Sequence, residues 1–234
     1  MTLRAQVFEA LGTVYVPELD EPITTLGFVG SCVVNGDDVE VRLRLPTPQC
    51  APNFAFLMAA DAAAAVGSVA GVAAVNVHLE DHYTGREINA AVNRGEGFAD
   101  AFPGETAGDL AALRRLFQRK ALLARQSRLL SRPAATLGEL TGPDADRCRE
   151  LRRELGIDAA DDAPPFVTGD GTPVAASDVR FRRMASLTAL SLETNGGMCR
   201  DLLKSRLSRR PRPTGHSVSC DVPLGTPDGK EVAA

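Results

Sequence analysis

Residues 39–45 alternate between apolar and charged side chains, and this alternation is the sequence feature that most constrains the fold. A period of two is typical of a strand with one buried face. An apolar stretch from Ile23 to Val34 comes before it, and Asn35-Gly36 stands between the two runs. Asn-Gly between strand-like segments is a strong hairpin signal. The sequence therefore predicts an antiparallel strand pair.

Neighbouring segments extend this pair into a small domain. Leu3 to Leu11 has the apolar stripe of a short helix, and the Ala-rich run from Phe54 to Val66 has high helix propensity. Val72 to Leu79 alternates again and predicts a third strand. The order helix, strand, strand, helix, strand predicts an α+β fold in which helices cover one face of a three-stranded sheet.

The rest of the chain is predicted to be helical or irregular. Helices are expected at Ile88–Phe98, Asp109–Leu130 and 145–156, and a loop at 158–178. A weak helical pattern at 184–207 is interrupted at Asn195-Gly196-Gly197. We therefore expect an α+β domain at 1–85, a helical extension at 86–132, a loop-rich and partly helical region at 133–207, and a disordered tail at 208–234.

Cysteine usage points to a reducing compartment. The chain has five cysteines and no Cys-x-x-Cys pair: Cys32, Cys50, Cys148, Cys199 and Cys220. The first residues show no basic segment followed by an apolar run, so no export signal is expected. Asp61 and Gly67 interrupt the Ala-rich segment, so no membrane span is expected. We therefore expect a cytoplasmic protein with reduced thiols.

The formal net charge of −4 conceals an asymmetry along the chain. Residues 1–110 hold 15 acidic and 5 basic side chains, whereas residues 111–234 hold 15 acidic and 21 basic ones. The basic excess gathers at Arg114–Arg132 and Arg200–Arg212. Nucleic-acid contact, an acidic protein partner, or docking of the basic part on the acidic part would each explain it. Few aromatic residues accompany the arginines, which favours protein contact over nucleic acid.

Cys50 is the main candidate for chemistry. It follows the alternating strand and precedes the Ala-rich helix, in a turn rich in proline: Thr47, Pro48, Gln49, Cys50, Ala51, Pro52 and Asn53. The positive end of a helix favours a thiolate, which is the nucleophilic and metal-binding form. A lone cysteine can also be a small core residue. The flanking prolines favour a solvent-facing turn.

Other candidate residues are weaker. His78 and His82 would lie about 13 Å apart on one strand, too far to share an ion. His82 could still approach Cys50 if the third strand pairs near the turn. Cys199 follows the Asn-Gly-Gly segment and is the second candidate thiol.

Five segments resemble the iron-sulfur cluster assembly-factor family that includes SufT and PaaD. They are Pro17-Glu18-Leu19, Leu26-Gly27-Phe28-Val29, Asn35-Gly36-Asp37-Asp38-Val39, Leu45 to Pro52, and Val72 to Val77. The resemblance implies a non-enzymatic accessory protein that helps to insert a metal cofactor into client enzymes. It matches Cys50 to the family's reactive cysteine. Val16-Pro17-Glu18 stands where the family usually has Asp-Pro-Glu, and Glu18 is a candidate neighbour of the thiol.

The resemblance also implies cargo and partners. An iron-sulfur cluster or iron would be bound transiently, with Cys50 as a candidate ligand. Partners would be a client metalloenzyme and other assembly proteins, with no nucleic acid or membrane, and a homodimer is an open option. The chain is also similar to long-tailed members that accompany soluble diiron monooxygenases, which would make an oxygenase the client.

Two other function classes stay open at this point. The first is a thiol-dependent enzyme with Cys50 as nucleophile and His82 as its candidate base, although no catalytic motif supports it. The second is a basic protein-interaction module without metal chemistry.

Overall fold

The computed structural model describes residues 1–105 and 110–208, and their contacts divide into two units. The first unit contains the described residues within 1–16, 21–107 and 199–234, and the second contains those within 17–20 and 108–198. The first unit thus continues beyond residue 85 and takes in a part of the chain far away in sequence. Of the predicted tail, residues 209–234 lie outside the described residues.

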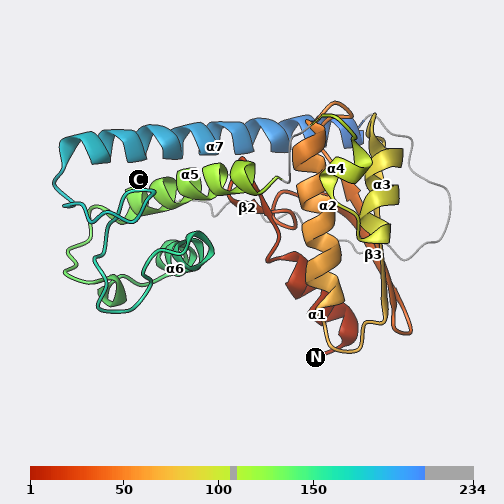
Figure 1. The fold of residues 1–234 in the computed structure, drawn as a ribbon, viewed down its shortest axis with the longest axis horizontal. Helices are drawn as coiled ribbons and strands as arrows, with labels where there is room; N and C mark the ends of the chain where they lie inside the picture. Colours follow the sequence, from red (N-terminus) through yellow and green to blue (C-terminus); the bar gives the residue numbers. More distant parts are fainter. Residues whose placement is uncertain (106–109, 209–234) are drawn as a thin grey trace, which may run out of the picture. The chain divides into compact units, whose positions relative to one another are not determined.

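The first unit contains the strands and helices of a mixed α+β fold (Figure 1). Its elements are α1 (Leu3–Leu11), β1 (Tyr15–Val16), β2 (Glu21–Pro22), β3 (Val29–Asn35), β4 (Asp38–Arg44), α2 (Pro52–Gly67), β5 (Ala74–Glu80), α3 (Gly85–Arg94) and α4 (Phe98–Ala101). Strands β3, β4 and β5 form one sheet in that order, and β1 pairs with β2. The three-stranded sheet and the mixed α+β class confirm the prediction.

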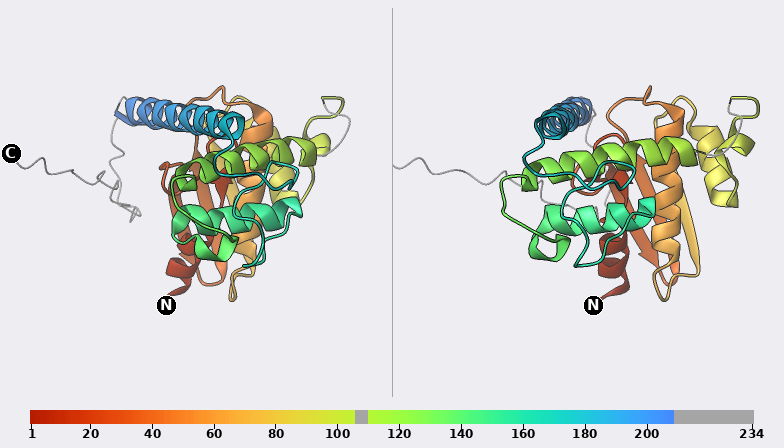
Figure 2. Two further views of the ribbon diagram at one scale, coloured as in Figure 1. Left: turned by 90° about the vertical axis from the view of Figure 1, so that its left-hand side faces the viewer. Right: turned by 60° about the vertical axis from the view of Figure 1, so that its left-hand side comes forward.

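Alternation along β4 creates the two faces of the sheet. Val39, Val41 and Leu43 are at most 2% exposed, whereas the charged residues between them point to the other face. In the parallel pair, Val41 lies opposite Val77 and Leu43 opposite Leu79, so apolar side chains of neighbouring strands share one face. Helices α1, α2 and α3 pack against the outer strands of this sheet (Figure 2). Burial of this apolar face is the main stabilising contribution in the first unit.

The first predicted strand begins later than expected. β3 starts at Val29, and the apolar residues before it belong to a compact turn rather than to the sheet. Ile23 donates its backbone N–H to Val14, and Phe28 donates to Ile23. Both side chains are at most 2% exposed. Ile23 and Phe28 are apolar because they fill the core. An apolar stretch in the sequence therefore does not distinguish a strand from a buried turn.

Two asparagines of α3 close the outer edge of β5. Asn93 accepts a hydrogen bond from the Val77 N–H at 2.8 Å and donates to the Val77 carbonyl at 2.9 Å. Asn89 makes the same pair with Leu79, at 2.7 and 3.3 Å. Asn89 and Asn93 are four residues apart, which is about 6 Å along a helix. Val77 and Leu79 are two residues apart, which is roughly 6.6 Å along a strand. The spacing of the two side-chain amides therefore fits that of the two backbone positions. The amides satisfy the backbone groups through which another strand could pair.

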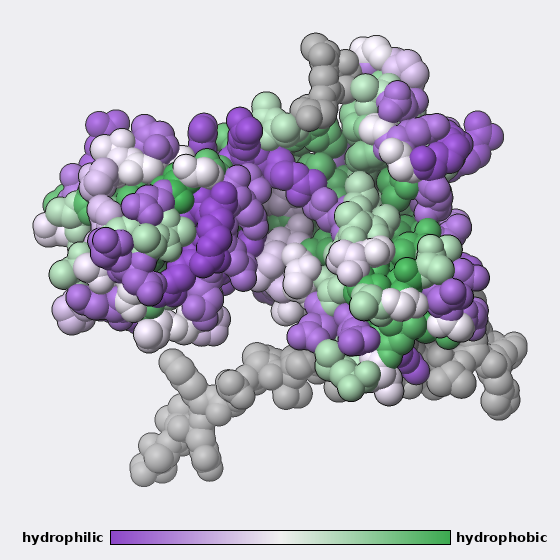
Figure 3. Space-filling view, turned by 60° about the horizontal axis from the view of Figure 1, so that its bottom comes forward, coloured by the Kyte–Doolittle hydropathy of each residue, from purple (hydrophilic) through white to green (hydrophobic). Residues whose placement is uncertain are grey.

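The second unit is helical. It contains α5 (Ala111–Leu129), η1 (Leu137–Glu139), α6 (Pro143–Leu155) and the portion of α7 (Val179–Ser208) up to Met198. Leu122, Leu151 and Phe166 are central to its core, each at most 1% exposed. The loop between α6 and α7 is anchored by Phe166 and Val167, which are at most 3% exposed. Figure 3 shows mostly hydrophilic residues on the visible face of this unit.

The predicted interruption at Asn195-Gly196-Gly197 is wrong, because α7 runs through these residues without a break. Glycine costs about 1 kcal/mol in a helix interior relative to alanine, and packing at both ends of the helix offsets this cost. Phe181 and Ala185 are buried before the glycines, and Leu203 is buried after them.

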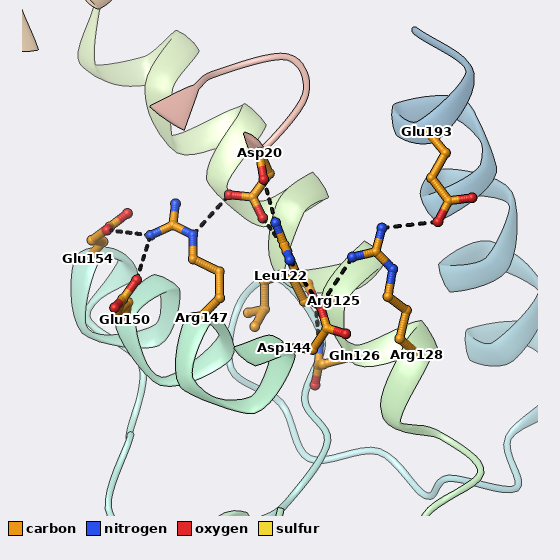
Figure 4. Close-up of polar contacts among 10 residues, drawn as sticks. All are labelled: Asp20, Leu122, Arg125, Gln126, Arg128, Asp144, Arg147, Glu150, Glu154 and Glu193. Atoms are coloured by element: carbon orange, nitrogen blue, oxygen red, sulfur yellow. Dashed lines mark hydrogen bonds and ion pairs between the residues drawn. The ribbon is translucent and has the colours of Figure 1, made fainter. Parts of the chain in front are cut away.

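A buried carboxylate organises the charges of the second unit (Figure 4). Asp20 is 3% exposed and accepts hydrogen bonds from Arg125 Nε at 2.7 Å and from Arg147 Nε at 2.9 Å. Arg125 also donates to the Asp20 backbone carbonyl. Burial alone would lower the pKa of Arg147, but the charges of Asp20 and Glu154 raise it above its usual value. The two arginines come from α5 and α6, so one carboxylate links both helices.

We predict that Asp20→Ala lowers the free energy of unfolding by about 1–3 kcal/mol, because the Nε groups of Arg125 and Arg147 lose their shared buried acceptor, while Asp144 and Glu154 still pair with the two arginines. Chemical denaturation followed by circular dichroism measures this loss. Asp146→Asn is the control, since Asp146 pairs with Arg149 at the surface with its side chain 69% exposed; its effect should stay within about 0.5 kcal/mol. Equal stability of the two variants would contradict the prediction.

Candidate functional site

Parallel pairing of β4 and β5 brings two turns together in the first unit. The carboxyl ends of neighbouring parallel strands meet at the same edge of a sheet, a common place for functional groups. β4 ends at Arg44 and leads into the Cys50 turn, while β5 ends at Glu80 and leads into residues 81–84. The backbone N–H of Tyr83 donates to the Pro48 carbonyl at 3.1 Å, which joins the two turns directly.

Cys50 lies in this turn at the beginning of α2. The helix starts at Pro52 with Ala51 as its N-terminal cap, so Cys50 comes one residue before the cap. Its thiol is partly exposed and lies 3.5 Å from the Thr47 hydroxyl. The side chain of Asn53 accepts a hydrogen bond from the Phe54 N–H within the first helical turn. Cys50 is therefore a partly exposed residue close to the positive end of a helix.

His82 holds the Cys50 turn from the side of β5. The ring is 9% exposed, and its Nε2 lies 2.7 Å from the Cys50 carbonyl. Its Nδ1 lies 3.3 Å from the Thr84 backbone N–H, which can only donate. Nδ1 is therefore the acceptor, and Nε2 carries the proton and donates to Cys50.

The surroundings of His82 favour its neutral form. Burial lowers the pKa of His82, and the positive charge of Arg206 lowers it further, although the hydrogen bond to the Cys50 carbonyl acts in the opposite direction. Because both ring nitrogens are engaged, His82 positions the backbone of the turn. In this arrangement it does not accept the thiol proton.

Sequence reasoning missed Arg206, which reaches the same site from α7. Its Nη1 donates to the Leu45 carbonyl at 2.5 Å, and its Nη2 lies 3.3 Å from the Asp81 carboxylate. Arg206 stands 161 positions after Leu45. No local pattern indicates such a contact, because only folding brings these segments together.

Two other candidate residues come from different segments of the chain. Glu18 belongs to the second unit, where burial raises the pKa of its carboxyl and the charge of Lys120 lowers it. Its predicted place beside the thiol stays a prediction. Cys199 is partly exposed on α7 within the first unit, and its role is equally a prediction. Cys32 and Cys148 are buried.

Within residues 1–105 and 110–208, no group of three or more His, Cys, Asp or Glu side chains is arranged to hold a metal ion. In the same residues, no helix is both long and apolar enough to cross a membrane.

We predict that Cys50 is alkylated faster than Cys32 and Cys148 in the native protein. Burial raises the pKa of the Cys148 thiol to about 12, and Cys32 is 4% exposed, so both should react only after unfolding. Limiting iodoacetamide at neutral pH, followed by mass-spectrometric mapping, measures the order. Cys220 lies outside the described residues and is replaced by serine in all samples. Preferential labelling of Cys199 would contradict Cys50 as the principal reactive thiol.

We predict that His82→Ala lowers the free energy of unfolding by about 1–3 kcal/mol, because the Cys50 carbonyl loses its donor. His82→Gln should lose less, since its amide can still donate toward this carbonyl. His78→Ala is the matched control, because His78 is exposed on the opposite face of β5 from Val77 and Leu79. Thermal and chemical denaturation measure the differences. A loss no larger than in the His78 variant would refute the role of His82.

Comparison with known families gives a match to part of the chain. Residues 4–79 match the model of a family described as "Iron-sulfur cluster assembly protein". The matched segment begins in α1, includes Cys50 and ends in β5, so it leaves out His82 and Arg206. The match supports an iron-sulfur assembly family for this part of the chain. No curated protein matches the chain.

Proposed function

We propose that this protein is a non-enzymatic accessory factor for the maturation of iron-sulfur clusters or iron centres in client enzymes, with Cys50 as its functional thiol. The family match over residues 4–79 is the observation that carries the proposal. The partly exposed position of Cys50 at the start of α2 supports its role.

The chemistry of the site suits a transient carrier. Thiolates are the preferred ligands of iron-sulfur clusters, which are usually held by four cysteines in their final proteins. A carrier that offers one thiolate leaves the other coordination positions to its partner. A client with a complete set of ligands then binds the cargo more strongly and takes it over. Iron or a cluster is therefore cargo, and Cys50 is the residue that would contact it.

The proposed partners are a client metalloenzyme and other assembly proteins. The resemblance to long-tailed family members makes a diiron monooxygenase the first client to examine. We expect the protein to act in the cytoplasm, and self-association into a dimer would be compatible with a shared cluster.

The contacts of His82 argue against a thiol-dependent enzyme. Such an enzyme needs a base within reach of the nucleophile, and both ring nitrogens of His82 are already engaged. His82, the candidate base, is therefore already engaged by the Cys50 carbonyl.

Internal ion pairs argue against nucleic acid as the partner of the basic part of the chain. Several arginines of the basic part pair with acidic residues from the beginning of the chain: Arg125 and Arg147 with Asp20, Arg200 with Glu21, and Arg206 with Asp81. Filter binding of oligonucleotides at physiological salt distinguishes protein contact from nucleic-acid contact. Sub-micromolar binding that is lost on changing Arg114, Arg115 and Arg119 to Ala would favour the nucleic-acid alternative.

We predict that deletion of the gene lowers the iron content and the activity of at least one client metalloenzyme. Restoring the wild-type gene or a Cys199→Ser variant should recover both, whereas Cys50→Ser should not, because an alcohol is a poor ligand for iron-sulfur clusters. Metal analysis of purified clients, together with their activity, measures the effect.

Protein levels of each variant are measured alongside as a control for folding. Clients that are fully metallated and active in the deletion strain would refute the maturation role. Full recovery by Cys50→Ser would be compatible with the maturation role of the protein but would show that this role does not require Cys50.

A further inference from the structure

The last turns of α7 pack on the first unit along one helical face. Arg200 pairs with Glu21 at 2.5 Å. Leu203 is 4% exposed, and its side chain lies next to Gly27. Arg206 reaches the Cys50 turn. Positions separated by three residues lie on the same side of a helix, so one face provides all three contacts.

Arg206 links the two turns that form the thiol site. Through Leu45 it holds the end of β4 where the Cys50 turn begins, and through Asp81 it contacts the turn that leads to His82. The Arg206 side chain is 15% exposed, so its position is defined by packing as well as by these bonds. A guanidinium group can make such bonds simultaneously, because its donors form a planar fork.

The charge of Arg206 is directed toward the thiol site. Burial lowers the pKa of Arg206, the neighbouring Arg44 lowers it further, and the charges of Cys50 and Glu80 raise it. Glu80 binds Arg44 at 2.6 Å and lies 3.8 Å from Arg42, so much of its charge is already paired. Asp81 is the carboxylate that contacts Arg206, at 3.3 Å and with its side chain 46% exposed. Solvent weakens such an exposed pair, so Asp81 offsets the charge of Arg206 only in part.

We propose that Arg206 is a positioning residue of the thiol site, which holds the Cys50 turn in place and attracts anions toward the thiol. This inference rests on the proposed function and specifies its cargo. Iron-sulfur units ligated by thiolates carry net negative charge, because sulfides and thiolates together outweigh the iron ions. A guanidinium held at the turn that carries the acceptor thiol favours their approach. The C-terminal helix thus completes a site that the family-matched segment contains only in part.

Alkylation with two reagents of different charge tests this inference. The neutral iodoacetamide and the anionic iodoacetate react with the same thiolate, so the ratio of their rates at Cys50 cancels changes in thiolate population. We measure this ratio in protein with Cys199 and Cys220 replaced by serine. In Arg206→Gln the ratio of the iodoacetate rate to the iodoacetamide rate should fall about threefold or more at low salt, since the attracting charge is lost.

Two further variants separate charge from structure. Arg206→Lys keeps the charge and should keep most of the ratio. Arg200→Gln removes a charge from the same helical face at Glu21 and should leave the ratio near that of the wild type. An unchanged ratio in Arg206→Gln, or an equal fall in Arg200→Gln, would overturn the inference.

Salt provides a test that needs no substitution. Raising the salt from about 0.02 to 0.5 M shortens the screening length severalfold, so the wild-type ratio should fall toward that of Arg206→Gln. A ratio independent of salt would also overturn the inference, even if Arg206→Gln did not fold. Neither readout involves a client enzyme, so the role of Arg206 and the maturation function can fail separately.

Discussion

The parallel pairing of β4 with β5 is the constraint on which the thiol site depends. Parallel neighbours require a crossover connection, and α2 supplies it between the two strands. Both strands therefore end at one edge of the sheet, where their following turns meet. Cys50 follows one strand and His82 the other, and a 2.7 Å contact joins them. An antiparallel arrangement would place these turns at opposite ends of the sheet.

Side-chain alternation and two helix asparagines together define the limits of that sheet. The side chains of Val41 and Leu43 on β4 are buried in the core. Those of Val77 and Leu79 on β5 lie beside them on the same face of the sheet. The outer edge of β5 is then closed by Asn89 and Asn93, which imitate a neighbouring strand. This closure helps to prevent a further strand, from the same protein or another, from joining the sheet beside the thiol site.

The charge asymmetry of the chain is expressed as specific ion pairs. Within the second unit, Arg125 and Arg147 meet on Asp20. Within the first unit, Arg206 meets Asp81. Each pair joins residues far apart in the sequence and helps to hold their segments in one arrangement. A buried pair such as that of Asp20 contributes less net stability than its short distances suggest, because burying the charges is costly. The basic segments thus act in part as internal docking elements.

The sequence alone determined the features that depend on local physical rules. Strict alternation at 39–45 and the Asn-Gly dipeptide predicted the hairpin, because period and turn chemistry act over a few residues. Proline placement and the Ala-rich run similarly predicted Cys50 in a turn before α2. The continuous course of α7 through Gly196 and Gly197 required tertiary structure, since packing outweighs the local cost of glycine. Arg206 is the clearest case. Its contact with the Cys50 turn depends on where a remote helix lies after folding, and no residue near it in the sequence carries that information.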